Sequence, residues 1–461
     1  MSRIINNYFD GLAITPRHRL IYVVIMFAYF FEQFDNWNFG YVLPSIMQSM
    51  GLDMGHAGII TSWYFVGMMT GSIAGGILAD MLGRRNALQL GVLIFSGSSV
   101  ACGLADGFWL LTAARALTGF GIMCVNMSVI PYTTEISPAE SRGKWQNLIA
   151  AAGLVGVPAV GVLCRILLPL HPEAWRWVFY AGGAGILLFL GAHRFIPESP
   201  RWLMARGRRE EAEQVVREIS GVDVDLSEVK VEKGGIRPSP AEMLLGLFSR
   251  DHVRTALVVI SPFLLLGPAS YLFQNWTTTL FKSQGFSLED SLTITLFMQL
   301  GIPVGLFAFS YLSELGGRKL PIVISLFFMG FSGLAITFCT IPLIGSMICM
   351  GAAGLSFIWW TEIWQYCAAG FLMMGCTNGM IYTYLAYASE SFPSSIRSIG
   401  LAVLQAGNRI MTSLSSLVVP VLYGTFGFSG IISAFCALCV IPALFMAFFA
   451  KRTGGKPLEE I

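Results

Sequence analysis

Charged residues are scarce in this sequence. Of its 461 residues only 12% are charged and 55% are hydrophobic, whereas about a quarter of the residues of a typical soluble domain are charged. This composition excludes a soluble globular fold. A membrane span needs about 20 mostly apolar residues, so the length leaves room for about a dozen spans, their loops and one larger polar insert. We therefore predict an all-α, multi-pass protein embedded in a lipid bilayer.

The sequence also lacks the motifs of membrane hydrolases and primary pumps. It contains no Walker loop, no His-Glu-x-x-His and no nucleophile elbow. None of the five histidines lies at the centre of an apolar run, which argues against a histidine proton relay. The nine cysteines lie in apolar stretches and are expected to be free thiols. We predict no enzymatic activity, no metal and no cofactor, and the net charge of +2 gives no reason to expect a nucleic-acid partner.

Apolar runs long enough to cross a bilayer occur twelve times, and we number these predicted spans 1 to 12. They cover about 20–44, 57–80, 86–105, 108–134, 145–169, 176–196, 254–281, 291–314, 320–341, 364–388, 396–423 and 428–450. We predict an N-terminal six-helix bundle over 1–196, a cytoplasmic linker with helices over 197–253, and a C-terminal six-helix bundle over 254–461.

Basic residues are distributed unevenly along the chain. If both termini are cytoplasmic, the inner loops, tails and linker hold 24 of the 29 basic residues. The other five are Arg165, Arg176 and Lys282 outside, and Arg115 and Arg409 within spans. The positive-inside rule therefore predicts cytoplasmic termini.

Two charged motifs recur in the two halves. Segment 80–85, Asp-Met-Leu-Gly-Arg-Arg, follows span 2 and matches segment 314–319, Glu-Leu-Gly-Gly-Arg-Lys, after span 8. Segment 135–142 after span 4 and segment 390–397 after span 10 share Glu, Pro and Arg at the same spacing. Two motifs in matching order indicate a duplicated six-span unit with pseudo-twofold symmetry. Both must be cytoplasmic, so the apolar stretch at about 342–361 is not a further span, and we expect it at the outer membrane interface.

These motifs place opposite charges at the inner ends of neighbouring helices. If they bridge the halves in the outward-open state and separate in the inward-open state, they form a latch. The alternative is ordinary orientation-setting charge. The predicted cytoplasmic gate comprises Asp80, Arg84, Arg85, Glu135, Arg142, Glu198, Arg201, Glu314, Arg318, Glu390 and Arg397.

At this point the chain resembles the major facilitator superfamily over nearly its whole length. Segment 80–85 is similar to the signature between spans 2 and 3 of that superfamily, with Met where a base is common. The repeated Glu-x-x-Pro-x-x-x-Arg elements and the Pro-Glu-Ser-Pro-Arg-Trp of 197–202 resemble the sugar-porter and metabolite:proton symporter branches. The resemblance implies two six-helix bundles around a central cavity lined by spans 1, 4, 7 and 10, with contributions from 5, 8 and 11.

Span 1 narrows the resemblance. Glu32-Gln-Phe-Asp35, followed by Gly40 and Pro44, resembles the aromatic acid:proton symporter pattern, with Glu replacing the first Asp and Gln the Gly. Arg115-Ala-Leu-Thr-Gly-Phe-Gly in span 4 fits the same relatives. Gly-Asn-Arg-Ile at 407–410 is similar to the Gly-Arg-Ile-Gly of aromatic-acid, niacin and organic-anion transporters, with Asn408 and Met411 in place of the flanking glycines.

Charged residues inside spans are expensive and usually face a cavity or a partner. Glu32 and Asp35 share a helix face in span 1. Counting from the outer ends, Asp35 and Arg115 lie at similar depths and could meet. The resemblance implies an acid on span 1 coupled to an Arg on span 4 as a proton switch, and the alternative is a permanent ion pair that fixes packing. We predict Asp35, Glu32 and Arg115 for proton coupling, with the proton as the coupling ion.

Arg409 lies in the middle of span 11, where it cannot reach either surface. A guanidinium suits a carboxylate, so we predict that Arg409 binds a substrate anion. The alternative is that it is a counter-ion for Glu32 or Asp35. Other polar or aromatic residues in spans are candidates for the same cavity, or for interhelical hydrogen bonds. They are Asn36, Trp37, Asn126, Gln274, Asn275, Gln299, Tyr382, Tyr384, Gln405 and Asn408.

Together these observations predict a secondary active transporter of the inner membrane that carries a small organic anion with a proton by alternating access. We expect an aromatic or sugar-derived carboxylate as substrate and a monomer as the functional form. Three alternatives stay open, namely a sugar or polyol symporter, an organic cation transporter and a transporter-like nutrient sensor.

Overall fold

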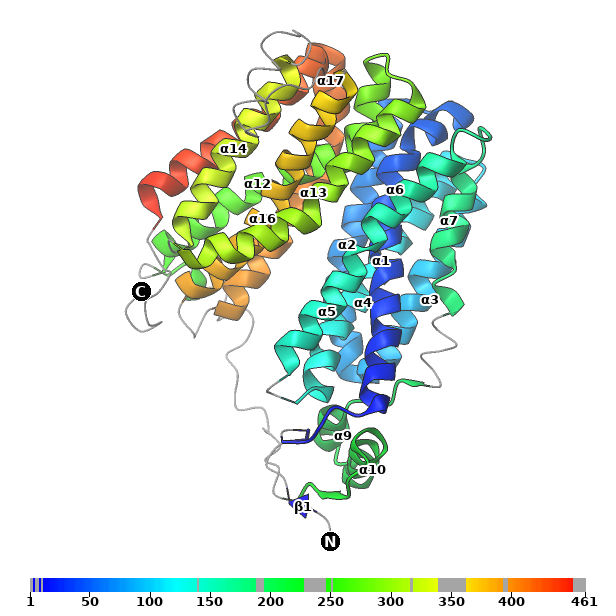
Figure 1. The fold of residues 1–461 in the computed structure, drawn as a ribbon, viewed down its shortest axis with the longest axis vertical. Coiled ribbons are helices and arrows are strands. Elements are labelled where there is room, and N and C mark those ends of the chain that lie inside the picture. Colours follow the sequence, from blue (N-terminus) through cyan, green and yellow to red (C-terminus); the bar gives the residue numbers. More distant parts are fainter. Residues whose placement is uncertain are drawn as a thin grey trace. The chain divides into compact units, whose positions relative to one another are not determined.

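The computed structural model of the chain is almost entirely helical (Figure 1). Apart from helices it contains β1, Arg3–Ile4, which pairs in parallel with β2, Val224–Asp225. The structure describes residues 3–4, 8–9, 11–138, 141–187, 195–227, 246–249, 252–315, 318–338, 362–392 and 397–450. The predicted interfacial stretch at 342–361 lies outside these residues.

Contacts divide the chain into two compact units. Unit 1 contains Met1–Asn38, Trp63–Val160 and Glu173–Arg237, and unit 2 contains Phe39–Ser62, Gly161–Pro172 and Pro238–Ile461. The first part of the chain forms nine described helices. They are α1 (Pro16–Met50), α2 (Met54–Leu82), α3 (Arg84–Gly103), α4 (Phe108–Ile136), α5 (Arg142–Leu154), α6 (Gly156–Leu167), α7 (Trp175–Gly183), α9 (Pro200–Ala205) and α10 (Arg209–Ser220). The second part forms α12 (Val253–Ser283), α13 (Leu288–Leu315), α14 (Lys319–Phe338), α16 (Glu362–Ser391) and α17 (Arg397–Phe449).

Within the described residues, seven helical segments are long and apolar enough to cross a membrane. One of them, α17, contains two predicted spans. Gly427, at φ 63°, interrupts its helical backbone between predicted spans 11 and 12. A positive φ suits glycine, which has no Cβ to clash with the backbone.

Glycines allow the closest helix approaches in both units. A Cβ added at Gly67 or Gly71 of α2 would lie 1.9 or 2.4 Å from a carbonyl oxygen of α4. A Cβ added at Gly301 or Gly305 of α13 would lie 2.0 Å from a carbonyl oxygen of α16. Both pairs are separated by 234 residues (301 minus 67 and 305 minus 71), the same offset as between segments 80–85 and 314–319. The duplication detected in the charged motifs therefore extends to helix packing, since small residues four apart bring membrane helices together.

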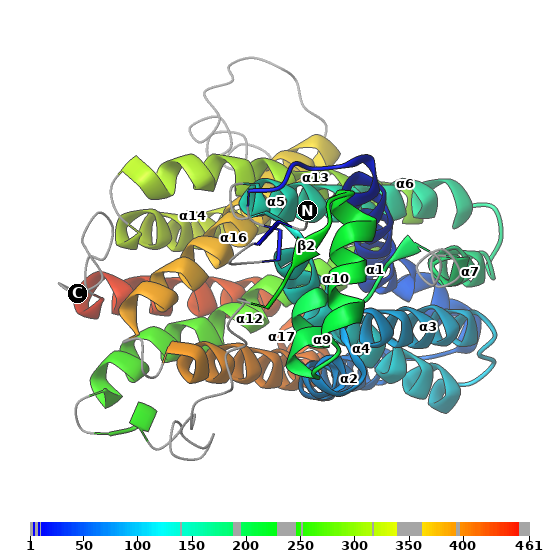
Figure 2. The ribbon, with the colours of Figure 1, turned by 90° about the horizontal axis from the view of Figure 1, so that it is seen from below.

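The linker begins as two short helices that belong to unit 1. Ser199 caps α9 by accepting a hydrogen bond from the Trp202 amide, and Pro200 occupies the first helical position, where no amide hydrogen is needed. Helix α10 ends at Gly221, which is left-handed at φ 74°. Figure 2 shows α9 and α10 beside the ends of α1, α2 and α4, with β2 next to α10.

Candidate functional site

A buried ion pair joins α1 and α4 in unit 1. The Nη1 atom of Arg115 lies 3.8 Å from Oδ2 of Asp35, and the side chains are 1% and 0% exposed. The structure thus brings together two of the three residues predicted for proton coupling. A charge buried in this way needs a partner, because desolvation costs several kcal/mol per ion.

Two neutral side chains complete the surroundings of the carboxylate. Oδ1 of Asp35 accepts hydrogen bonds from the Ser99 hydroxyl of α3 at 2.6 Å and from the Asn38 amide at 2.8 Å. A Cβ added at Gly182 of α7 would lie 2.4 Å from the same oxygen. Asp35 is therefore held by α1, α3, α4 and α7 together.

The guanidinium of Arg115 has neighbours of a different kind. Its carbon lies 4.3 Å from the ring centroid of Tyr64, a cation–π contact. Nη1 also donates a long hydrogen bond of 3.5 Å to Oδ1 of Asn38. The Tyr64 hydroxyl donates to Oδ1 of Asn36, one of the residues predicted to contact substrate. The aromatic face of Tyr64 therefore helps to stabilise the cation.

Glu32 belongs to a second polar group in unit 1. It is 1% exposed, and its two oxygens accept hydrogen bonds of 3.0 Å from the amides of Asn126 and Gln33. The Trp37 indole donates to Gln33 at 3.1 Å. Asn126, predicted as a substrate contact, therefore satisfies an acid in the structure, as the interhelical alternative proposed.

In unit 2, the predicted polar stripe around Arg409 lies on α17 and is partly exposed within the structure. The Asn408 amide donates 2.7 Å to the Phe263 carbonyl of α12, and Thr412 donates 2.8 Å to the Asn408 carbonyl. Gln405, one turn earlier, is exposed. Asn408 is thus used in packing α17 against α12, while Arg409 and Gln405 are more accessible than a core residue.

The remaining predicted substrate residues lie on α12, α13 and α16 of unit 2. The Gln274 amide donates a long hydrogen bond of 3.5 Å to Asn378, and Asn275 is half-buried. Gln299 is 1% exposed, and its Oε1 has no hydrogen-bond partner among the described residues. The Tyr384 hydroxyl donates 2.8 Å to the Val259 carbonyl, so it contributes to packing within the unit. The Tyr382 side chain lies outside the described residues.

The charged motif after α2 forms a network with the end of α4. Arg84 donates to Asp80 at 2.5 Å and lies 3.6 Å from Glu135. Glu135 in turn accepts a hydrogen bond of 2.6 Å from Ser199. Arg142 lies at the start of α5, half-buried. The network therefore links α2, α3, α4 and the first linker helix within unit 1.

Glu198 lies just before α9 and contacts the beginning of α3. Its Oε1 accepts hydrogen bonds from the backbone amides of Arg85 at 3.1 Å and Ser199 at 2.9 Å. Burial raises the pKa of this carboxyl, while the amides partly oppose that effect. Gly83 stands at φ 99°, and a Cβ there would lie 2.1 Å from a Glu198 oxygen. The glycine of the motif is thus required both by its backbone conformation and by the approach of Glu198.

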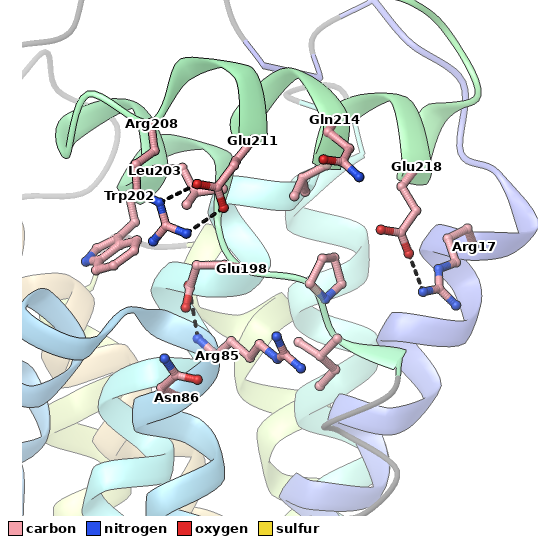
Figure 3. A pocket seen from close by; sticks show the side chains of 13 residues that line it. Arg17, Arg85, Asn86, Glu198, Trp202, Leu203, Arg208, Glu211, Gln214 and Glu218 are labelled. Carbon is pink, nitrogen blue, oxygen red and sulfur yellow. Dashed lines mark hydrogen bonds and ion pairs between the residues drawn. The ribbon is translucent and has the colours of Figure 1, made fainter.

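Figure 3 shows the pocket beside Glu198, which has a volume of about 380 Å³. Its charged lining is largely compensated: Arg17 lies 2.5 Å from Glu218, and Nε of Arg208 donates 2.6 Å to Glu211. None of the residues predicted to contact substrate lines it. Arg201, also of the predicted gate, is exposed on α9.

Unit 2 repeats the central contact of this network. Nε of Arg318 donates 2.7 Å to Glu390, and these two residues correspond to Arg84 and Glu135 in the repeat. Nε of Arg397, the first residue of α17, donates 3.2 Å to the Phe392 carbonyl. The Glu314 side chain lies outside the described residues. The observed pairs each lie within one unit, and a latch between the halves stays a prediction.

Several residues of the site were not singled out from the sequence. Ser99, Asn38 and Tyr64 are uncharged, and serine, asparagine and tyrosine occur in many spans without a functional role. Asn38 carried one available signal, because it lies three residues after Asp35 and so on the same helix face. Gly182 lies in the short run Ala-Gly-Gly-Ala at 181–184, which indicates close helix packing but not its partner.

Comparison with solved structures defines the class of protein. The inward-open conformation of the xylose transporter XylE from Escherichia coli matches with a TM-score of 0.71 at 19% identity, over 95% of this chain and 98% of that chain. At this identity the likeness establishes the fold alone, which is the major facilitator fold of twelve membrane-spanning helices. The chain therefore has the architecture of a multi-pass membrane protein.

The family follows from the sequence comparison. The family described as "Sugar (and other) transporter" matches residues 19–461, and the chain belongs to it. It is 26% identical to the inner membrane metabolite transport protein YdjE of Escherichia coli, over 98% of this chain and 97% of that protein. It is also 26% identical to the niacin transporter NiaP of Acinetobacter baylyi, over 98% of each chain. The predicted fold class, the absence of enzymatic activity and the superfamily resemblance are confirmed.

Proposed function

We propose that this secondary transporter carries a small organic anion together with a proton, by alternating access at the inner membrane, with both termini in the cytoplasm. The observation that carries the proton part is the buried pair of Asp35 and Arg115, 3.8 Å apart. In this proposal Asp35 takes up the proton, and Arg115 compensates the carboxylate after the proton has left.

The chemistry of the pair suits this role. An acid shielded from water favours its neutral form, whereas a nearby guanidinium favours the charged form. Moving Arg115 away from Asp35 by a few ångströms would therefore favour uptake of the proton, and moving it closer would favour release. The 3.8 Å separation exceeds that of a direct charge-assisted hydrogen bond, about 2.7–2.9 Å, so the pair is not locked in its tightest geometry.

The position of Arg409 supports the proposal of an anionic substrate. It is a cation placed inside a span, and it is only half-buried within unit 2. A guanidinium binds a carboxylate through two parallel hydrogen bonds. One relative at 26% identity is named a niacin transporter, and niacin is a small aromatic carboxylate, which is consistent with the aromatic-acid pattern of span 1.

A neutral sugar is the second candidate substrate. The matching family is described by sugar transport, and the similar solved structures include a D-xylose-proton symporter at 20% identity and a TM-score of 0.70. Gln274, Asn378 and the unsatisfied Oε1 of Gln299 offer amide groups of the kind that bind hydroxyls. Both candidates use the same proton site. They differ in whether Arg409 must bind the substrate.

The proton part is tested with purified protein in liposomes. Asp35→Asn is expected to abolish accumulation driven by a pH gradient while sparing exchange of labelled for unlabelled substrate. Asp53→Asn is the control, since Asp53 is an exposed residue of the loop before α2. Accumulation by Asp35→Asn at the level of the control would overturn the proposal.

The substrate class is tested by thermal stability in detergent, because a ligand of the native state raises the melting temperature by mass action. Aromatic acids, sugar acids, neutral sugars and organic amines are compared at two pH values. Stabilisation by carboxylates that is lost in Arg409→Ala supports the anion. Stabilisation by neutral sugars that survives in Arg409→Ala would transfer the proposal to a sugar symporter, and stabilisation by amines would contradict both.

A further inference from the structure

The Ser99 hydroxyl lies between two oxygen atoms from different helices. Its Oγ is 2.6 Å from Oδ1 of Asp35 on α1 and 2.9 Å from the Phe179 carbonyl oxygen on α7. Ser99 itself lies on α3 and is fully buried. Both neighbours stand at hydrogen-bond distance, and each contact requires one hydrogen atom between its two oxygens.

Counting hydrogens separates the two protonation states of Asp35. A serine hydroxyl has one hydrogen to donate and two positions at which it can accept. When Asp35 is ionised, Ser99 can donate to the carboxylate or to the Phe179 carbonyl, so one contact lacks its hydrogen. When Oδ1 of Asp35 is protonated, the acid donates to Ser99 and Ser99 donates to Phe179, so both contacts are satisfied. Ser99 thus bonds Asp35 in both states: it donates a charge-assisted bond to the carboxylate and accepts a weaker, neutral bond from the protonated acid.

We infer that Ser99 is a positioning residue for proton coupling, which hydrogen-bonds Asp35 in both protonation states and turns its own hydrogen from Asp35 to Phe179 when the acid takes up a proton. This inference rests on the proposed role of Asp35. No covalent bond to Ser99 forms or breaks: the proton on Asp35 comes from water and returns to water, and Ser99 keeps its hydrogen.

The helix that carries Phe179 is in direct contact with the same carboxylate. A Cβ added at Gly182, one turn after Phe179, would lie 2.4 Å from Oδ1 of Asp35 and 2.9 Å from Oγ of Ser99. Only glycine leaves room for both groups at this point of α7. The protonation state of Asp35 on α1 thereby affects α3 and α7, which belong to the predicted third and sixth spans.

Other titratable groups around the carboxylate come from each neighbouring helix. Helix α4 provides Arg115, α3 provides the buried Cys102 thiol, and α1 itself carries Glu32 one turn earlier. The Tyr64 phenol of α2 lies beside Arg115. Helix α7 contributes backbone at its two contact positions. Among the residues that the structure describes, the Ser99 hydroxyl is the side-chain group that hydrogen-bonds both Asp35 and Phe179.

The test is the pH dependence of substrate uptake in liposomes by Ser99→Ala. A hydrogen bond donated to a carboxylate is stronger than one accepted from a neutral acid. Removing the hydroxyl therefore disfavours the ionised form more, and we expect the midpoint of the pH profile to move up by about one pH unit. Ser98→Ala is the matched control, since Ser98 is a neighbouring buried serine bound to Thr118 and to its own helix. Its midpoint is expected to equal that of the unchanged protein.

Two further variants keep the test decisive. Ser99→Cys is close in size but has a weak donor, so it is expected to show the upward shift if the alanine variant does not fold. Ser99→Thr retains the hydroxyl and is expected to restore the midpoint. Midpoints for Ser99→Ala and Ser99→Cys that equal that of Ser98→Ala, with Asp35→Asn inactive in pH-driven accumulation, would overturn this inference alone. Accumulation by Asp35→Asn would instead overturn the proposed function.

Discussion

The guanidinium of Arg115 approaches the carboxylate of Asp35 through one nitrogen, at 3.8 Å, and its Cζ atom lies 4.3 Å from the ring centroid of Tyr64. The carboxylate directs its other oxygen to Ser99 and Asn38. The two charges are thus close enough to compensate each other, and each also has neutral partners: Asn38 contacts both groups, Ser99 contacts the acid and Tyr64 the guanidinium. With such partners the pair can separate without leaving either group bare, which a transporter requires if the acid is to exchange its proton.

Arg115→Lys is expected to impair coupling although it keeps the charge. A lysine ammonium cannot lie flat on an aromatic ring and span toward Asp35 and Asn38 in the way a planar guanidinium does. We expect uphill uptake to fall by more than tenfold, while the melting temperature falls less than in Arg115→Ala, which leaves Asp35 buried without a counter-charge. Uphill uptake by Arg115→Lys at the unchanged rate, measured in liposomes, would show that charge alone suffices.

The contact between Asp35 and Arg115 could be anticipated because depth can be counted along a helix from its ends. Which neighbour a polar residue meets could not be counted in that way. Asn126 bonds Glu32 and Tyr384 bonds the Val259 carbonyl, and both looked like cavity residues in the sequence. Periodicity gives the face of a helix and its depth, but the rotation of one helix against the next depends on packing, as at Gly182.

The charged motifs were more predictable because they repeat. Their order and spacing indicated a duplicated unit, and the structure repeats the contact itself, with Arg84 beside Glu135 and Arg318 beside Glu390. The sequence analysis placed Glu198 in the same gate as Arg84 and Arg85, but it did not predict that Glu198 would lie against Gly83. Only the fold of the linker onto unit 1 brings them together.

Neutralising Arg318 or Glu390 is expected to slow transport with little loss of stability. The pair is 29% and 21% exposed, and partly exposed ion pairs contribute on the order of 1 kcal/mol or less. If the motif acts as a latch, Arg318→Gln and Glu390→Gln should each reduce uptake several-fold, and the double variant no further. Additive losses in the double variant would show that the two residues act separately.

The same experiment at the corresponding position of unit 1 tests the repeat. Arg84→Gln and Glu135→Gln are expected to follow the pattern of the pair in unit 2. The pair of Arg208 and Glu211 is the control, because it lies on the linker and is about half exposed at both side chains. Loss of uptake of equal size in the Arg208→Gln variant would indicate a general effect of surface charge.

Gly83→Ala is expected to destabilise the protein. A Cβ at this position would lie 2.1 Å from a Glu198 oxygen, and the backbone stands at φ 99°, which disfavours any residue with a side chain. We expect a cost of about 1–3 kcal/mol, seen as a lower melting temperature and reduced uptake. Gly76→Ala in α2 is the control, since nothing lies within 4 Å of a Cβ there. Equal melting temperatures for the two variants would refute the close approach of Glu198.

His18 connects the stability of unit 1 to pH. It is fully buried beside Phe9, with Nδ1 bonded to Thr15, and burial lowers its pKa to about 4. The unfolded chain, with a histidine pKa near 6.5, binds more protons between pH 6.5 and 4, so this group reduces stability as the pH falls through that range. His18→Asn is therefore expected to flatten the decline of melting temperature from pH 7 to pH 5 by a few degrees. His56→Asn, at an exposed histidine, should keep the original slope. A slope for His18→Asn equal to that of the control would mean that His18 already carries its proton in the folded protein.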